Sequence, residues 1–197
     1  MMKKDEQLNA IQQYVKGLFR MDVTGHDFYH MKRVANTAKF LAEYENADSF
    51  LCEAAAWLHD VGDHKLFQQP NQVREEMNLF LKTISMSDKE VETINAIIQN
   101  ISFSKGNIPE TLEGRIVQDA DRLDAIGAVG IARTFAYGGA NSQFIYNENP
   151  QKTSIQHFYD KLLHLKDKMN TEKAKQMATD RHQFMEQFLD QFHKEWS

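Results

Sequence analysis

The chain has 197 residues, of which 42% are hydrophobic and 26% are charged. This composition is typical of a globular protein and excludes disordered and fibrous classes. Lysine and arginine number 23 against 28 aspartate and glutamate residues, so the net charge is −5 with neutral histidines. That sign disfavours nonspecific nucleic-acid binding, which positive charge drives. A chain of this length usually forms one domain.

Three features bear on the compartment. A single cysteine, Cys52, cannot form an internal disulfide, which fits a reducing cytosol. The first ten residues, MMKKDEQLNA, are charged and lack the apolar region of a signal peptide. No apolar run approaches the roughly 18 residues that a membrane helix needs. We therefore predict a cytoplasmic protein without a membrane segment.

Apolar residues recur at the three- and four-residue spacing of a helix face through most of the chain. The first such face starts at Phe28, where Asp27 or Thr24 can serve as the N-cap. Ser87, followed three residues later by Glu90, forms a capping-box pattern. The predicted helices cover residues 28–42, 49–62, 73–84, 87–98, 110–135, a stretch starting at 154, and 171–196.

No stretch shows the alternation of a β-strand, and the chain contains no repeat or low-complexity segment. We therefore predict an all-α fold, a single domain over residues 1–197 with about eight helices. The motifs that could carry chemistry all lie within residues 26–124, and helices within residues 154–196 are expected to pack on the core. Gly127 and Gly130 would permit close packing or a kink in the helix that contains them.

Histidines are the most informative residues of the sequence because their distribution is uneven. Four lie early in the chain: His26, His30, His59 and His64. Four lie late, on predicted surface helices, and are not expected to bind metal: His157, His164, His182 and His193. The early group therefore marks the candidate site.

The string WLHDVGDHK is the strongest local motif, because its charged residues directly follow the apolar run AAAWL. Burying His59 and Asp60 without a partner would cost several kcal/mol, which a bound cation would offset. Neighbouring side chains on a helix diverge by about 100°, so the two residues could coordinate one ion from two sides. Asp63, one turn later, could reach a water on that ion. Imidazole with carboxylate suits Mn, Fe, Co, Ni or Zn rather than Ca.

Two further strings carry the same chemistry. GHDFYHMKRV contains His26 and His30, and QDADRLDAIG contains three carboxylates on an otherwise apolar helix: Asp119, Asp121 and Asp124. On a helical projection Asp119 and Asp124 flank the core face more closely than Asp121 does. Periodicity alone therefore does not choose the metal ligand among the three.

The ordered set of His30, the His59–Asp60 pair and Asp121 resembles the HD-domain metal-dependent phosphohydrolase superfamily. The longer sequence from about Gly25 to Trp196 resembles the small bacterial YedJ/YpgQ-like group of this superfamily. The resemblance implies an HD-domain helical bundle and makes the four residues of the ordered set the metal ligands. Among the three aspartates of this segment, the resemblance favours Asp121 as the ligand through the motif A-D-x-x-D-A.

The resemblance also implies catalytic roles. Asp63 occupies the position where relatives carry an acidic residue that orients or activates water. His64 or His26 could protonate the leaving oxygen or hold a phosphate. The candidates for phosphate binding are the cations beside the motifs: Lys65, Arg122 and Arg33.

The resemblance implies a hydrolase of phosphate esters or anhydrides that uses a divalent cation. Mn²⁺ or Mg²⁺ is the leading expectation, with Fe, Co, Ni and Zn as alternatives. For the YedJ/YpgQ-like group the resemblance implies nucleoside or deoxynucleoside triphosphates as substrates and release of pyrophosphate. The expected partner is a small phosphate compound rather than a membrane or a nucleic acid, and a homodimer stays open.

Two other functions remain open from the sequence. An HD-type di-iron oxygenase would need ligands for a second ion, which His64 and His26 could supply. A nucleotide-sensing protein could retain the metal without turnover. The sequence also leaves open whether Asp119 or Asp124 assists Asp121.

Overall fold

The computed structural model describes residues 2–20, 25–101, 107–147 and 152–196. Within these ranges the fold is all-α, as predicted, and the described residues include no β-strand. The α-helices are α1 (Lys4–Phe19), α2 (Phe28–Glu45), α3 (Ser49–Leu58), α4 (Pro70–Thr83), α5 (Asp88–Asn100), α6 (Leu112–Asp124), α7 (Gly127–Ala140), α8 (Ser154–Asp160) and α9 (Glu172–Trp196). Two short 3₁₀ helices, η2 (Leu162–His164) and η3 (Lys166–Lys168), connect α8 to α9.

The capping signals of the sequence operate where they were expected. Asp27 caps α2 by accepting the backbone N–H of His30 at 2.7 Å, whereas Thr24 lies outside the described residues. Ser87 and Glu90 form a capping box at the start of α5. Such caps satisfy backbone donors that have no partner within the helix. They fix the first residue of each helix and thereby the face that each helix buries.

The predicted helix over residues 110–135 is wrong in its continuity, because the chain breaks it into α6 and α7. Gly127 adopts a φ of +78°, a left-handed conformation that disfavours other residues. A Cβ on Gly130 would lie 2.3 Å from the carbonyl oxygen of Ala125. These glycines therefore turn the chain sharply. A second difference is α1, which was not among the predicted helices. It buries Ile11, Val15 and Phe19, which are four residues apart in the sequence.

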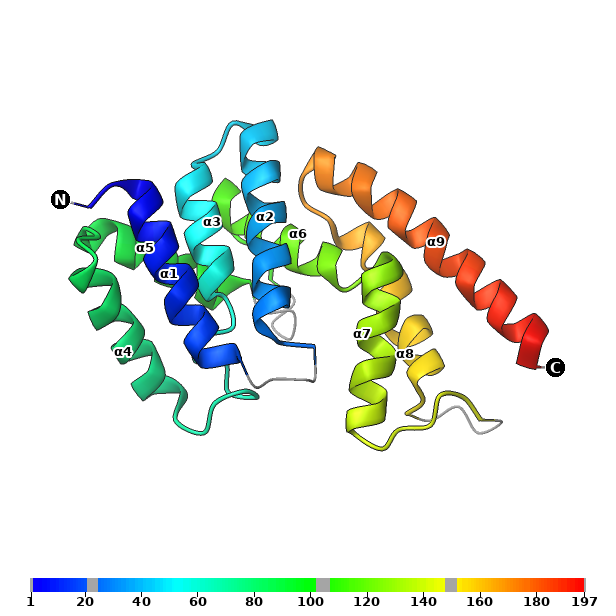
Figure 1. Ribbon diagram of the computed structural model, residues 1–197. Coiled ribbons are helices and arrows are strands. Elements are labelled where there is room, and N and C mark those ends of the chain that lie inside the picture. Colours follow the sequence, from blue (N-terminus) through cyan, green and yellow to red (C-terminus); the bar gives the residue numbers. More distant parts are fainter. Residues whose placement is uncertain (1, 21–24, 102–106, 148–151, 197) are drawn as a thin grey trace.

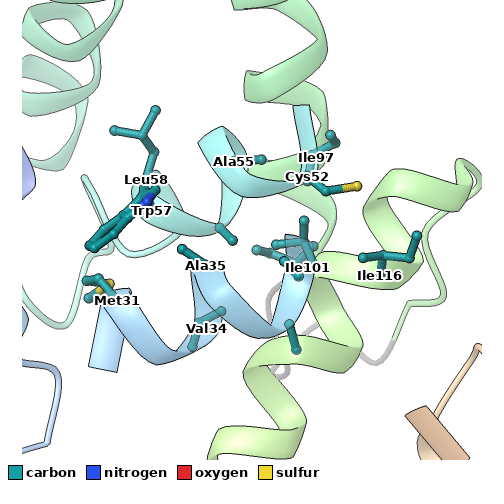
Figure 2. Packing of buried hydrophobic residues seen from close by; sticks show 14 of the residues in the cluster. Met31, Val34, Ala35, Cys52, Ala55, Trp57, Leu58, Ile97, Ile101 and Ile116 are labelled. Carbon is teal, nitrogen blue, oxygen red and sulfur yellow. The ribbon is translucent and has the colours of Figure 1, made fainter. Parts of the chain in front are cut away.

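One apolar core joins these helices, with buried residues contributed from α1 through to α9. Helix α2 packs against α3 and α6 at its centre, and α9 runs along α7 on the far side of the molecule from α4 (Figure 1). Figure 2 shows Met31 and Ala35 of α2 on the side that faces α3 in this core. Small side chains on both helices allow a close approach, which brings the start of α2 near the end of α3.

Among the described helices, none has both the length and the apolar character needed to cross a lipid bilayer.

Candidate metal centre

Two buried histidines form the base of the site, one at the start of α2 and the other just after α3. His30 is fully buried, and His59 is 8% exposed. The sequence predicted a helix that runs through His59 and Asp60, but α3 ends at Leu58 and this pair lies in the turn that follows. The apolar run before the pair anchors the end of α3 in the core, so the turn presents both side chains inward.

The hydrogen bonds of the two imidazoles determine which nitrogen is available to a ligand. His59 donates from Nδ1 to the carbonyl oxygen of Ala56 at 2.8 Å, and a carbonyl can only accept. His30 places its Nδ1 2.8 Å from Oδ2 of Asp124, which also acts as an acceptor when ionised. Each neutral ring therefore carries its hydrogen on Nδ1 and directs the lone pair of Nε2 to the opposite side.

Both Nε2 atoms are buried, and neither has a hydrogen-bond partner among the described residues. A buried polar atom without a partner is costly, so this pair requires an explanation. Metal-binding histidines commonly show this arrangement, in which one nitrogen is held by an acceptor and the other faces the ion. The two orphaned nitrogens therefore fit a cation site.

Two carboxylates complete the arrangement. Asp60 lies with Oδ2 3.6 Å from Nε2 of His30 and with Oδ1 3.5 Å from Nε2 of His59. Asp121 places Oδ1 3.7 Å from both Nε2 atoms. Ligand atoms about 2.0–2.2 Å from a cation lie roughly 3–4 Å from one another, so these separations suit a shared ion better than direct hydrogen bonds. The structure thus brings together all four predicted ligands: His30, His59, Asp60 and Asp121.

The electrostatics of the site favour positive charge. Burial would lower the pKa of His30, but its contacts with the Asp124 and Asp60 carboxylates raise it to about 9. Burial would raise the pKa of Asp60, yet the neighbouring imidazoles of His59, His26 and His30 hold it well below its usual range. The carboxylates therefore stay ionised, and a cation can take the place of the proton on His30.

The three predicted catalytic residues lie at different distances from this centre. His26 is in contact with it, because Nδ1 lies 2.9 Å from Oδ2 of Asp60. Asp63 lies in the turn after the pair, where Oδ1 accepts the backbone N–H of Lys65 at 2.7 Å. His64 is 70% exposed on the same turn, 3.8 Å from Asp63. The structure therefore connects His26 directly to a predicted ligand and leaves His64 facing solvent.

The predicted phosphate-binding arginines are engaged within the fold. Arg33 binds Asp124 through two hydrogen bonds of 2.6 and 3.0 Å. Arg122 is 7% exposed and donates to the backbone carbonyl of Lys168. Lys65, by contrast, is exposed beside the site. Arg122 is thus withdrawn from solvent, whereas the side chain of Arg33 is 36% exposed and that of Lys65 is exposed.

The question of which aspartate assists Asp121 is answered by the surroundings of the other two. Asp124 contacts the ligand His30 and is held by Arg33 and Arg133, the latter at 2.8 Å. Asp119 instead accepts the backbone N–H groups at the start of α9. Asp124 is therefore the carboxylate that orients the ring of His30, a predicted ligand. Arg133 is a residue that no motif in the sequence indicated.

A cavity of about 500 Å³ lies on the other side of Asp124, between α2, the start of α7 and α9. Arg33, Gly127, Arg181 and Phe184 are among its lining residues. None of the four predicted metal ligands lines it, so it is separate from the metal centre.

Comparisons with known proteins bear on this site. Residues 27–126, just over half of the 197 residues, match the HD domain family. The chain belongs to the HD domain family. It is 40% identical to YpgQ of Bacillus subtilis over 98% of this chain and 96% of YpgQ. This relationship confirms the resemblance found in the sequence.

Two solved structures of this family are similar over nearly the whole chain. The crystal structure of Bacillus subtilis YpgQ in complex with ADP has a TM-score of 0.87 at 39% identity, covering 98% of this chain and 97% of that one. The crystal structure of an HD-superfamily hydrolase from Bacillus thuringiensis has a TM-score of 0.82 at 43% identity, covering 98% of each chain. The chain is therefore a member of a hydrolase superfamily, with relatives that share its entire fold.

Proposed function

We propose that this protein is a metal-dependent phosphohydrolase that cleaves nucleoside or deoxynucleoside triphosphates and releases pyrophosphate. The observation that carries the proposal is the pair of buried Nε2 atoms of His30 and His59 that face two carboxylates. The ADP bound to the related YpgQ supports a nucleotide as the substrate. The hydrolase of the same superfamily from Bacillus thuringiensis supports hydrolysis as the reaction.

The four residues that would hold the cation are two neutral imidazoles and two ionised carboxylates: His30, His59, Asp60 and Asp121. A divalent ion bound there supplies Lewis acidity toward a phosphoryl oxygen and makes a water molecule more acidic. We favour Mn²⁺ over Mg²⁺, since imidazole is a better ligand for the softer ion and carboxylate suits both.

In the proposed reaction, a water oxygen bonds to the α-phosphorus, and the bond from that phosphorus to the bridging oxygen breaks. The products are a nucleoside monophosphate and pyrophosphate. Asp63 is the candidate to orient this water and accept its proton, because its carboxylate lies in the turn directly after the His59–Asp60 pair. His26, in contact with Asp60, is the better placed of the two histidines to hold a proton near the leaving oxygen. His64 remains the second candidate.

The test is a nucleotide panel incubated with metal-free protein, with and without added Mn²⁺ or Mg²⁺. Chromatography of the products should show pyrophosphate and a nucleoside monophosphate, only when metal is present. Release of inorganic phosphate instead would overturn the proposed bond, and no release from any nucleotide would overturn the proposed substrate class. Two tightly bound irons per chain with oxygen consumption would favour the di-iron alternative, for which the contact of His26 with Asp60 offers a further ligand. Nucleotide binding without turnover would favour a sensor.

A further inference from the structure

The cavity between α2, the start of α7 and α9 is separate from the metal centre, although Asp124 lines it. Its volume of about 500 Å³ lies within the range of pockets that bind small molecules. Its walls come from α2, from the junction of α6 and α7, and from α9. The proposed reaction uses no residue of the α9 wall, so the cavity has no role in that reaction.

Arg181 of α9 brings a positive charge to this cavity without an anionic partner. Its aliphatic stem packs on the turn before α7, because a Cβ on Gly127 would lie 3.0 Å from Cγ of Arg181. Its Nη1 donates to the carbonyl oxygen of Leu123 at 2.5 Å, and no carboxylate in the described part of the chain forms an ion pair with it. A carbonyl satisfies one N–H donor and leaves the charge without a counter-ion. An arginine that is fixed in this way suits an anionic ligand.

The two carboxylates that line the cavity do not supply the missing negative charge. Asp124 already accepts two hydrogen bonds from Arg33 and one from Arg133, and it contacts Nδ1 of His30 at 2.8 Å. Asp180 is exposed to water and forms no ion pair with the described residues. The arginines on the inner wall therefore share a single carboxylate that other groups also contact. An anion in the cavity would improve this balance of charge.

The other lining residues indicate what the remainder of the ligand is. Phe184 and Val129 line the cavity and are 49% and 42% exposed, and buried Ile126 continues the apolar part of the wall. An exposed phenylalanine ring can stack on a planar group. Asn36 and Thr37 of α2 add neutral hydrogen-bonding groups. The cavity therefore suits a small molecule with an anionic group and a planar, apolar part.

We propose that this cavity is a regulatory site for a small organic anion, a phosphoryl or carboxylate compound with a planar apolar part, bound by Arg181 and Phe184. Contacts within the fold connect the site to the metal centre. Arg33 donates from Nε and Nη2 to Asp124, which leaves its Nη1 for the ligand, and Asp124 holds the ring of His30.

The direction of the regulation follows from the charges. An anion in the cavity adds negative charge behind a predicted metal ligand, so it should tighten binding of the cation. The cation must then tighten binding of the anion by the same factor, because the coupling between two sites is reciprocal. Only this coupling rests on the proposed function, since the anion site itself requires neither metal nor turnover.

The test of the site uses phenylphosphonate, which combines a phosphoryl group with a phenyl ring and has no ester bond to cleave. Phenylacetate carries a carboxylate instead, and phenylacetamide is the neutral control. Each compound is titrated into the isotope-labelled, metal-free full chain, and NMR chemical shifts of the backbone amides of residues 127–129 locate the binding. Phenylphosphonate should shift these amides and bind at least about tenfold more tightly than phenylacetamide, with phenylacetate between the two.

Two pairs of variants separate charge and stacking from packing. Arg181→Met retains the stem that packs on Gly127 and should weaken binding of phenylphosphonate about tenfold, whereas Arg181→Lys should retain most of the affinity. Arg20→Met, the same loss of charge at the exposed end of α1, should change nothing. Phe184→Ala should weaken binding about threefold, and Phe144→Ala, at an exposed ring outside the cavity, should not. Circular dichroism establishes that each variant is folded.

The coupling is tested by calorimetry of Mn²⁺ binding with and without saturating phenylphosphonate. The Kd for Mn²⁺ should fall about fivefold in the wild type and stay unchanged in Arg181→Met at the same concentration. Tightening that persists in Arg181→Met would mean that the compound binds the metal itself, and it would overturn the coupling.

The site, its coupling and the proposed function fail in different ways. Equal affinity for phenylphosphonate and phenylacetamide, or shifts confined to the turn of residues 59–65, would overturn the anion site. If phenylphosphonate binds in the cavity but the Kd for Mn²⁺ does not change, the coupling is wrong and the site stands. If site and coupling both hold but no nucleotide is hydrolysed, the proposed reaction is wrong and this inference stands.

Discussion

Helix α6 carries two buried aspartates, Asp119 near its middle and Asp124 as its last residue, whose surroundings are opposite in character. Asp119 accepts hydrogen bonds from backbone N–H groups of Asn170 and Thr171 and from the Thr171 hydroxyl, all neutral donors at the start of α9. Asp124 contacts His30 and two guanidinium groups. Asp119 therefore holds the start of another helix, whereas Asp124 holds the ring of His30, a predicted metal ligand.

The pKa values of the two carboxyl groups follow from these partners. Burial raises the pKa of Asp119 above its ordinary value, because the neutral donors do not fully compensate for the loss of water. Burial also opposes ionisation of Asp124, but the contacts with His30 and Arg33 outweigh it and hold its pKa well below the usual range. A buried carboxylate that is surrounded by cations is the more informative sign of a functional site.

The largest effect should come from removing a ligand that neither of these aspartates touches. His59→Ala should abolish metal binding and reduce hydrolysis at least about a thousandfold, since the lost Lewis acidity amounts to several kcal/mol of transition-state stabilisation. The helical circular dichroism should persist, because the apolar core does not depend on the ion. Adding Mn²⁺ at about 100 times its Kd should stabilise the wild type by about 2.7 kcal/mol and leave His59→Ala unchanged.

Exposed His164 provides the control for this substitution. His164→Ala should bind metal and hydrolyse nucleotides like the wild type. If His59→Ala lost its metal but kept full hydrolysis, a metal-dependent reaction would be excluded.

A smaller effect on metal binding is expected from substitution of Asp124, the last residue of α6. Asp124→Asn should weaken metal binding about 10- to 100-fold, because an amide no longer fixes the His30 ring and leaves two arginines without their anion. The Kd for Mn²⁺, measured by calorimetry, is the informative quantity, because it does not depend on turnover. An unchanged Kd in a folded variant would mean that Asp124 serves packing alone.

The smallest effect on the metal site is expected from substitution of Asp119, near the middle of α6. Asp119→Asn should lower the free energy of unfolding by about 1–3 kcal/mol, because one oxygen that accepts backbone N–H groups becomes a donor. For a chain of this size each kcal/mol lowers the melting temperature by roughly 2–4 °C. The Kd for Mn²⁺ should not change. A loss of metal affinity equal to that of Asp124→Asn would remove the contrast between the two aspartates.

The helical fold was predictable because local signals agree with the tertiary structure over most of the chain. Asp27 and Ser87 cap helices where the pattern indicated, and the apolar faces that follow are buried. The sequence allowed for a kink at Gly127 or Gly130 but not for the complete break between α6 and α7, since helical spacing of apolar residues continues through residues 110–135. The break depends on how closely Gly130 approaches the Ala125 carbonyl, which is a contact rather than a pattern.

The candidate ligands were also named from the sequence, although the choice of Asp121 came from the family resemblance and not from its helical position. In the structure Asp121 lies 3.7 Å from both Nε2 atoms, because the crossing of α2, α3 and α6 brings it over the two rings. Helical periodicity identifies the buried face of one helix. It carries no information on which other helices pack against that face.

The sequence alone determined the helical class, the early cluster of histidines and the residue types that suit a cation. Only the tertiary structure decided that Asp124 orients His30 while Asp119 holds the start of α9, and that Arg33 and Arg122 form bonds within the fold. The physical reason is one of distance along the chain. His30 and Asp124 are 94 residues apart, and their contact depends on how helices pack, which no local pattern encodes.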